Sequence, residues 1–466
     1  MDVIKTSLII GIGLTLYYLL LQWPVDNEVN DRYSQEQIEI DSFNDSERSL
    51  SEPLAPLSQA SQGQVEVASD ELDYFEIQNN DLSLMVESRT GRFEVSSLKN
   101  ITEEKGSEER FSIFGRTYDA SSGRENVYFA NSGFYTRTQG YLNPEFEKIT
   151  EQSGQGNSRV YVLEGASSGL SFSRKIEIED RGYSIKIEDT VKSVLGEDIA
   201  ITPYVVIERD DSAVEEGGLM YTYLGPVFSS TKDTYEKYDF DDIKESSYQN
   251  KSVGGWVALI QHYFLSAWIP DQNEEYLYQG RYGDNSGRYS LGYTSRDSVL
   301  SYGETASTKN TLYVGPKLPK QLVEIEENLD LTVDYGFLWW LGKPMYWFLD
   351  LGHSIFNNWG LAIIFLTVAL KVLTWPLSAK AYVSMGKMRE LAPKMQLLQE
   401  KHGDNRQAMS QELMEVYKKE GVNPLGGCLP MLAQMPFFLA FYWVLLETVE
   451  LRHSPFFLWI DDLSAM

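Results

Sequence analysis

Three stretches of the chain are continuously apolar and approach the length of a membrane-spanning helix. They are residues 6–23, 359–375 and 429–446. A helix crosses a hydrocarbon core with about 20 residues, at about 1.5 Å per residue, so each stretch spans with slight help from its flanks. No small-x-small cleavage pattern follows the first stretch, which favours an uncleaved signal anchor over residues 1–23. The pattern predicts a multi-pass α-helical membrane protein, with the later spans at 351–376 and 428–449.

Between the first two spans, apolar and polar positions alternate with a period of two, as in half-buried strands. Residues 81–86 and 92–98 flank a glycine-containing turn, and residues 169–178 and 183–191 flank another. Residues 256–270 are apolar almost throughout and suit two buried strands. Many short strands with few helical periodicities predict a large β-sandwich domain, which we place at residues 71–320.

Other segments connect these parts. Residues 24–70 are acidic and poor in aromatic residues, which predicts a flexible tether. Residues 336–349 are rich in tryptophan and interrupted by Gly-Lys-Pro, which predicts a broken interfacial helix within a linker at 321–350. Residues 377–427 carry apolar positions spaced three and four apart, which predicts an antiparallel helical hairpin.

Formal charge is concentrated in one block of the chain. Residues 23–335 hold 56 acidic and 28 basic side chains, whereas the remaining residues are balanced. The excess of negative charge in residues 23–335 would repel the phosphates of a nucleic acid, which argues against nucleic-acid binding there. Residues 376–428 hold eight basic side chains in a short loop, and the positive-inside rule places that loop in the cytoplasm. The N-terminus is therefore predicted to be cytoplasmic, with the β-sandwich and residues 450–466 on the far side.

The two later spans each carry one strongly polar residue, Lys371 and Gln434. Thr367 and Thr374 stand four before and three after Lys371, so the three residues share one polar stripe of a helix. One loop joins the two spans, so Lys371 and Gln434 are expected at similar depth, roughly 7–9 Å inside the same leaflet. Two interpretations remain open. The residues line a shallow polar notch, or Lys371 snorkels to the headgroups and Gln434 bonds a neighbouring helix.

The sandwich shows no catalytic constellation in its sequence. His262 is flanked by apolar residues and suits a core or edge position better than a ligand position. Asp239, Asp241 and Asp242 form an acidic cluster without Cys or His at metal-ligand spacing. We therefore expect no enzyme activity, no metal and no cofactor. A membrane-anchored carbohydrate-binding or scaffold protein stays open as an alternative function.

Several short motifs are distributed along the chain: VNPLGGC at 422–428 followed by Pro430, QMP at 434–436, VELR at 449–452, NWG at 358–360, WPL at 375–377, LTVDYG at 331–336 and GGWVA at 254–258. Together they resemble the YidC-type membrane-protein insertases. The resemblance runs from the N-terminal anchor to Met466 and is weakest in the tether. A large far-side sandwich is typical of Gram-negative members of that family.

The resemblance implies a fold, a location and a function. The sandwich is expected to be mutarotase-like and periplasmic, in a protein of the bacterial inner (plasma) membrane. Proteins of this family receive a nascent hydrophobic segment in a polar intramembrane groove and release it laterally into the bilayer, alone or with the Sec translocon. Matching positions imply that Lys371, Thr367, Gln434 and Phe438 line this substrate groove.

The expected partners are nascent membrane proteins, the lipid bilayer, the Sec translocon, and the ribosome with its targeting factors. Lys387, Lys394 and Lys401 give the hairpin a basic docking surface, beside methionines that suit adaptable apolar contact. No sequence-specific nucleic acid is expected.

The chain departs from the family pattern in two ways. Lys371 stands where the family usually has arginine, which keeps the charge but loses the planar fork of donors. The family core has five spans, and this sequence ends at Met466 after two of them and the anchor. We therefore expect either a fragment of a longer protein or a truncated gene product.

Overall fold

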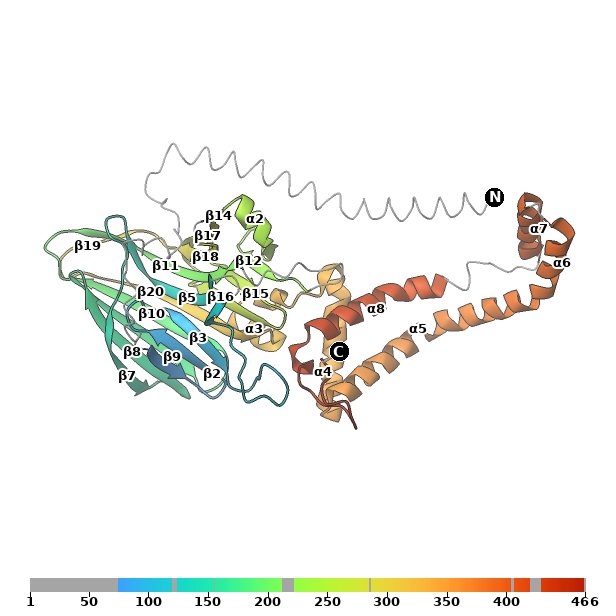
Figure 1. Ribbon diagram of the computed structural model, residues 1–466, viewed down its shortest axis with the longest axis horizontal. Coiled ribbons are helices and arrows are strands. Elements are labelled where there is room, and N and C mark those ends of the chain that lie inside the picture. The colour runs from blue at the N-terminus through green and yellow to red at the C-terminus, as the bar shows by residue number, and fades with distance from the viewer. Residues whose placement is uncertain are drawn as a thin grey trace. The chain divides into compact units, whose positions relative to one another are not determined.

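The computed structural model describes residues 74–119, 124–154, 156–211, 222–284, 286–403, 406–419 and 429–464 (Figure 1). The predicted anchor at 1–23, the predicted tether at 24–70 and the other residues before β1 lie outside these residues. The described residues belong to two compact units. The sandwich unit runs to Asp334 and resumes at Leu445, and the helical unit lies between them, at Tyr335–Val444.

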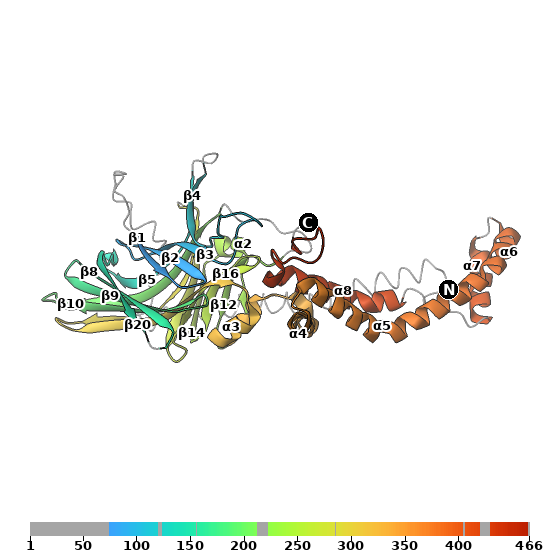
Figure 2. The same ribbon diagram turned by 90° about the horizontal axis from the view of Figure 1, so that it is seen from below.

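Two antiparallel sheets build the sandwich unit (Figures 1 and 2). The first is eleven-stranded and follows the path β1 (Tyr74–Gln78), β2 (Leu82–Glu87), β3 (Phe93–Leu98), β5 (Arg124–Thr136), β11 (Ile199–Asp210), β18 (Arg288–Thr294), β17 (Glu275–Gly283) and β14 (Tyr248–Val253), with β4 (Gly115–Asp119) and β6 (Gly140–Tyr141) on β5 and β19 (Ser298–Leu300) on β11. The second is nine-stranded and follows the path β13 (Glu236–Lys237), β12 (Gly225–Ser229), β15 (Trp256–Ile260), β16 (Phe264–Pro270), β20 (Thr305–Pro316), β10 (Ser184–Ser193), β9 (Leu170–Glu179), β8 (Ser158–Ser167) and β7 (Phe146–Ser153).

The strands follow the predicted alternation closely. Every second residue of β9 is buried, because successive side chains of a strand point to opposite faces. Both predicted hairpins are confirmed, as β2 pairs with β3 and β9 pairs with β10. All residues of β15 and β16 are buried, so the two strands predicted at 256–270 are confirmed as core strands. The predicted β-sandwich is therefore confirmed.

Arg174 of β9 joins the two sheets from within the core, where its side chain is 1% exposed. Its Nε donates to Asp189 of β10 at 2.6 Å, and its Nη2 donates to the carbonyl oxygen of Ser132 in the opposite sheet at 2.6 Å. Its Nη1 donates to the carbonyl oxygen of Gly91, in the turn between β2 and β3. Gly91 has φ +76°, and a Cβ there would lie 2.9 Å from the guanidinium, so this turn requires glycine. The buried charge is thereby satisfied on several sides.

Shorter elements complete the sandwich unit. They are α2 (Phe240–Glu245), α3 (Pro319–Ile325), η3 (Leu329–Thr332) and η6 (Val449–Leu451). The helical unit holds η4 (Gly336–Leu338), α4 (Trp339–Phe356), α5 (Trp359–Glu390), α6 (Ala392–His402), α7 (Arg406–Lys419) and the greater part of α8 (Leu429–Glu447). Among the described helices, α5 is long and apolar enough to cross a membrane, over Trp359–Pro376, and α8 has a shorter apolar part, Gln434–Glu447.

The predicted interfacial helix differs from the structure in its continuity. α4 runs without a break through the Gly-Lys-Pro sequence and ends at Phe356, not near residue 350. Gly342 is buried, and a Cβ there would lie 2.7 Å from the side chain of Tyr335. The glycine therefore allows Tyr335 to pack closely against α4, and it does not end the helix. The tryptophans Trp339, Trp340 and Trp347 are each more than half exposed. An exposed tryptophan face agrees with an interfacial position.

The apolar span of α5 ends at Pro376, but the helix itself continues further. α5 passes through Pro376 and extends to Glu390, because a proline removes only one helical hydrogen bond when the flanking turns hold. Its N-terminus is capped by Asn358, whose side chain accepts from the amide of Leu361 at 3.0 Å. The hairpin is formed by α6 and α7, and the hydroxyl of Tyr417 contacts the sulfur of Met395 at 3.6 Å. α5 ends at Glu390 and α6 begins at Ala392, so the helix is interrupted at Leu391, two residues before Pro393.

Replacing Arg174 with methionine is expected to lower the free energy of unfolding by about 3–5 kcal/mol, because Asp189 then stays buried without its cation. Denaturant titration of the purified protein in detergent, followed by fluorescence, measures this loss.

The matched control is Lys148→Met, which breaks a Lys–Glu pair whose side chains are 66% and 54% exposed. A surface pair contributes less than about 1 kcal/mol, so this variant should unfold almost as the parent does. Equal losses for the two variants would contradict the linking role of Arg174.

Candidate functional site

The candidate site begins with the polar stripe on α5. Thr367 Oγ1 donates to the carbonyl oxygen of Ile363 at 2.8 Å, and Thr374 Oγ1 donates to that of Leu370 at 2.8 Å. Both hydroxyls are therefore satisfied within their own helix, as is usual for threonine in apolar helices. Lys371, between them on the same stripe, is exposed and extends toward α8.

α8 meets this stripe at two levels. The Nζ atom of Lys371 lies 5.2 Å from the centre of the Phe438 ring, within the range of a cation–π contact. Gln434 Nε2 donates to Ser378 Oγ at 2.8 Å. Seven residues separate Lys371 from Ser378 along α5, so the two contacts lie about 10 Å apart along the helix.

Lys371 and Gln434 therefore lie on neighbouring helices, α5 and α8, but each contacts a different residue of the other helix. Lys371 contacts Phe438, and Gln434 contacts Ser378. Sequence reasoning missed Ser378, although it stands four residues after Thr374 and so extends the same stripe. The bond from Gln434 matches the predicted bond to a neighbouring helix. The contact of Lys371 with an aromatic ring keeps the lysine beside α8.

The energies of these contacts are small. A cation–π contact contributes about 0.5–1 kcal/mol at exposed sites and about 2 kcal/mol when desolvated. A side-chain hydrogen bond between membrane helices contributes about 0.6 kcal/mol on average. Neither contact neutralises the ammonium of Lys371.

The predicted docking surface lies at the end of α5 and on α6. Lys387, Lys394 and Lys401 are exposed and recur every seven residues. Lys401 is paired with Glu412 of α7 at 2.7 Å, so part of its charge is compensated within the hairpin. The VNPLGGC motif at 422–428 lies outside the described residues.

The acidic cluster of the sandwich has a structural explanation. Asp239 caps α2, and Asp242 returns a hydrogen bond to the Asp239 amide at 3.0 Å, which together form a capping box. Burial raises the pKa of Asp239, and the neighbouring carboxylates of Asp242 and Asp241 add to the effect. In the described part of the chain, no group of three His, Cys, Asp or Glu side chains is arranged to hold a metal.

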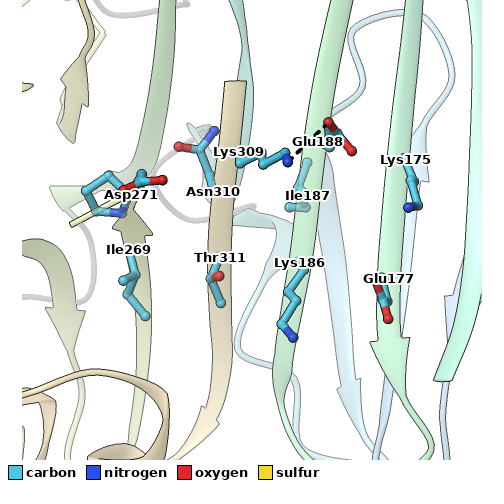
Figure 3. Close-up of a pocket in the computed structure, with 11 residues that line it drawn as sticks. Lys175, Glu177, Lys186, Ile187, Glu188, Ile269, Asp271, Lys309, Asn310 and Thr311 are labelled. Carbon is cyan, nitrogen blue, oxygen red and sulfur yellow. Dashed lines mark ion pairs between the residues drawn. The ribbon is translucent and has the colours of Figure 1, made fainter. Parts of the chain in front are cut away.

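An open pocket of about 330 Å³ lies on the outer face of the second sheet (Figure 3). Cross-strand register places Lys175 and Lys309 on either side of Glu188, and Lys186 opposite Glu177. Lys309 and Glu188 form an ion pair at 3.7 Å. None of the described residues that line the pocket is aromatic, so it offers no ring on which a sugar would stack. The charged side chains of the pocket are thus lysines and glutamates that face one another across neighbouring strands.

Comparison with known proteins assigns both parts of the chain. Residues 75–348 match the family model described as YidC periplasmic domain, and residues 351–466 match the one described as 60Kd inner membrane protein. The chain is 36% identical over 474 residues to membrane protein insertase YidC of Mannheimia succiniciproducens, covering 100% of this chain and 84% of that protein. It is 35% identical over 491 residues to membrane protein insertase YidC of Pseudomonas fluorescens SBW25, covering 100% of this chain and 85% of that protein.

Two solved structures each match about half of the chain, with 52% of it covered. A GH36 α-galactosidase of Geobacillus stearothermophilus has a TM-score of 0.36 at 7% identity, covering 52% of this chain and 40% of that one. A galactose mutarotase-like protein of Lactobacillus casei has a TM-score of 0.34 at 5% identity, covering 52% and 100%. Likeness at this level establishes neither fold nor function, so the mutarotase-like character of the sandwich stays a prediction.

The relatives are named as insertases, not as enzymes, and their similarity extends over the whole of this chain. The family models assign a periplasmic domain to the sandwich and an inner-membrane protein to the segment that contains α5 and α8. The chain therefore belongs to the YidC family of membrane-protein insertases.

Proposed function

We propose that α5 and α8 form part of a groove in which this insertase receives a nascent apolar segment before releasing it sideways into the inner membrane. The observation that carries the proposal is Lys371, a cation within the apolar part of α5 that lies over Phe438 of α8. A charged side chain at membrane depth is costly and is kept where it meets water, a partner or a substrate. Thr367 and Gln434 extend the polar surface on the two helices.

The groove acts by binding and electrostatics, without a covalent step. A client segment begins insertion by carrying a short polar tail into the leaflet, where water no longer solvates it. A fixed cation offsets part of this cost, because Coulomb attraction strengthens as the local dielectric falls. At an effective dielectric near 20, two unit charges about 4 Å apart attract by about 4 kcal/mol before desolvation is subtracted.

The orientation in the membrane belongs to the same proposal. The basic residues of α6 and α7 favour a cytoplasmic hairpin under the positive-inside rule. α5 and α8 then cross in opposite directions, the N-terminus lies in the cytoplasm and the sandwich lies in the periplasm. The exposed tryptophans of α4 suit the interface on the periplasmic side.

The hairpin supplies the surface for partners on the cytoplasmic side. Lys387 and Lys394 are exposed cations, and Lys401 shares its charge with Glu412. A basic surface attracts ribosomal RNA and acidic targeting factors over several ångströms, which raises the rate of encounter. The client is a nascent membrane protein. The Sec translocon is the expected partner for clients that need the translocon as well as the insertase.

Substitutions of Lys371 should separate clients by the charge of their tails. Lys371→Ala is expected to slow insertion of clients with acidic tails by about 5–30-fold, which corresponds to about 1–2 kcal/mol of lost attraction. Lys371→Arg should be tolerated, and Lys371→Glu should be worst for acidic tails. Protease protection of client pairs that differ only in tail charge measures the effect.

The matched control is Phe438→Leu, which keeps an apolar side chain beside Lys371 but removes the ring face. It should affect acidic and neutral clients equally, because it changes no charge. If Lys371→Ala slows both client types to the same extent, the electrostatic role is ruled out and Lys371 is a snorkelling lysine.

Reversing the charges of Lys387 and Lys394 should weaken binding to ribosomes. The double variant Lys387→Glu/Lys394→Glu is expected to lower ribosome affinity roughly 3–10-fold at low ionic strength. The difference should vanish near 1 M salt, where the Debye length falls to about 3 Å. Co-sedimentation across a salt series measures it.

The control for net charge is Lys418→Glu/Lys419→Glu, which makes the same change at the exposed end of α7. A smaller loss for the control locates the contact on α5 and α6. Equal binding by the parent and the Lys387/Lys394 variant at every salt concentration would refute a docking role for this surface.

A further inference from the structure

The boundary between the helical unit and the sandwich unit falls inside the helix α8. α8 runs without interruption to Glu447, but its residues belong to the helical unit only as far as Val444. The last turn of α8 and the residues after it belong to the sandwich unit. We call residues 445–464 the clip. The contacts of the clip lie with strands and turns that are far away in sequence.

The first contact of the clip is a fully buried ion pair. Lys317 Nζ and Glu447 Oε2 lie 2.5 Å apart, and both side chains are 0% exposed. Lys317 directly follows β20, and its backbone amide donates to the carbonyl oxygen of Tyr263 at 2.8 Å. Removing one partner of such a pair is strongly unfavourable, because the other charge stays buried alone. The geometry at Glu447 is therefore tightly defined.

A histidine holds the neighbouring residue. His262 Nε2 lies 2.9 Å from the carbonyl oxygen of Leu446, in the last turn of α8, and donates to it. Burial lowers the pKa of His262, and the nearby charges of Lys317 and Arg452 act in the same direction. The ring is therefore neutral near neutral pH and serves as a hydrogen-bond donor to a helix end whose carbonyls lack helical partners.

Arg452 makes a second point of attachment. Its guanidinium lies 4.9 Å from the ring centre of Phe111 and 5.4 Å from that of Phe264, and these two rings stack at 4.1 Å. It also donates to the carbonyl oxygens of Thr102 at 3.1 Å and Glu103 at 2.7 Å. An arginine suits this position because its planar group stacks and donates at the same time. This contact explains the arginine of the VELR sequence.

A carboxylate near the end of the clip, Asp462, bonds back to an earlier residue of the clip, His453. Asp462 accepts hydrogen bonds from the amide of His453 at 3.0 Å and from its Nδ1 at 2.9 Å. Burial alone would raise the pKa of Asp462, but the bonds from Ser464 and His453 outweigh it and lower that pKa to about 2. The carboxylate therefore stays ionised and holds the loop at any physiological pH.

We propose that the clip holds the outer end of α8 on the sandwich, and that Lys317, Glu447 and Arg452 are positioning residues for Phe438 in the groove. This inference rests on the proposed function. Phe438 lies nine residues before Glu447, about 13 Å along one helix. Pro436 lies on the far side of Phe438, so no proline interrupts the helix between Phe438 and the anchored turn. Because α8 is one helix over this stretch, a rotation or shift of its last turn at Glu447 is carried along the helix to Phe438.

A positioning role fits a buried ion pair better than a role in stability alone. Replacing such a pair by apolar residues of similar size is often neutral or stabilising, so the pair is weak evidence for stability. Its directional bonds instead select one register of the elements that carry the charges, here β20 and α8. The outer end of α8 would otherwise be an apolar helix end with little to fix its rotation.

The test replaces the pair without leaving a buried charge. In the full chain, Lys317→Met/Glu447→Leu is combined with a photo-cross-linking p-benzoylphenylalanine at Phe438 of α8, or at Val368 of α5, which is 55% exposed. A stalled nascent client is the probe. The yield at Phe438 should fall about fivefold or more, because cross-linking depends steeply on placement, while the yield at Val368 changes less than about twofold.

Two further variants separate positioning from folding. The charge swap Lys317→Glu/Glu447→Lys should restore cross-linking at Phe438. The control Lys309→Met/Glu188→Leu removes an exposed Lys–Glu pair from the same sandwich and should change neither yield. An equal fall at Phe438 and Val368 in the Met/Leu variant, or no fall at either, overturns the proposal.

Hydrogen exchange tests the clip independently of clients. Arg452→Ala should lower the protection of amides in residues 445–464 about tenfold or more relative to the rest of the sandwich. Unchanged protection contradicts the clip. If the parent protein shows this protection but cross-links clients at neither Phe438 nor Val368, the proposed groove fails and the positioning role falls with it.

Discussion

Taking a cation out of water is the constraint on which both units depend. Arg174 and Lys317 are buried in the sandwich unit, and Lys371 lies in the apolar part of α5. Arg174 donates to the carboxylate of Asp189 in its own sheet and to the carbonyl oxygen of Ser132 in the other, and Lys317 pairs with Glu447. Lys371 has a ring on one side and keeps its charge. The first two contacts fix structure, because each buried cation has a carboxylate partner, whereas the contact of Lys371 is with a ring.

The helical unit is, among the described residues, an insertion in the chain of the sandwich unit. The chain leaves the sandwich after Asp334 and returns at Leu445. Both crossing points carry an ion pair on the sandwich side, Lys237 with Asp334 and Lys317 with Glu447. The sandwich unit thus carries a buried or half-buried Lys–carboxylate contact close to each point where the chain enters or leaves it.

Local pattern was sufficient to predict much of this fold. The hairpins of β2 with β3 and β9 with β10, the buried strands β15 and β16, and the helical α6–α7 pair all follow from spacing and turn residues. The unbroken α4 was not predictable, because Gly342 packs against Tyr335 and the sequence alone reads as a break. The pairing of Lys317 with Glu447 spans 130 residues, and no periodicity connects positions so far apart. In the candidate site, the stripe of Lys371 could be found from sequence, whereas the choice of Phe438 and Ser378 as contacts depends on how α8 faces α5.

The continuity of α5 has a mechanical consequence. Its 32 residues make a rod about 48 Å long, whereas a hydrocarbon core is about 30 Å thick. The part beyond the core ends next to α6, where the basic surface begins. Pro376 leaves the carbonyl of Val372 without its helical donor, so the most compliant point of the rod lies one residue beyond Lys371. A bend of α5 at this point would change the direction in which α6 and α7 extend from the segment that carries Lys371.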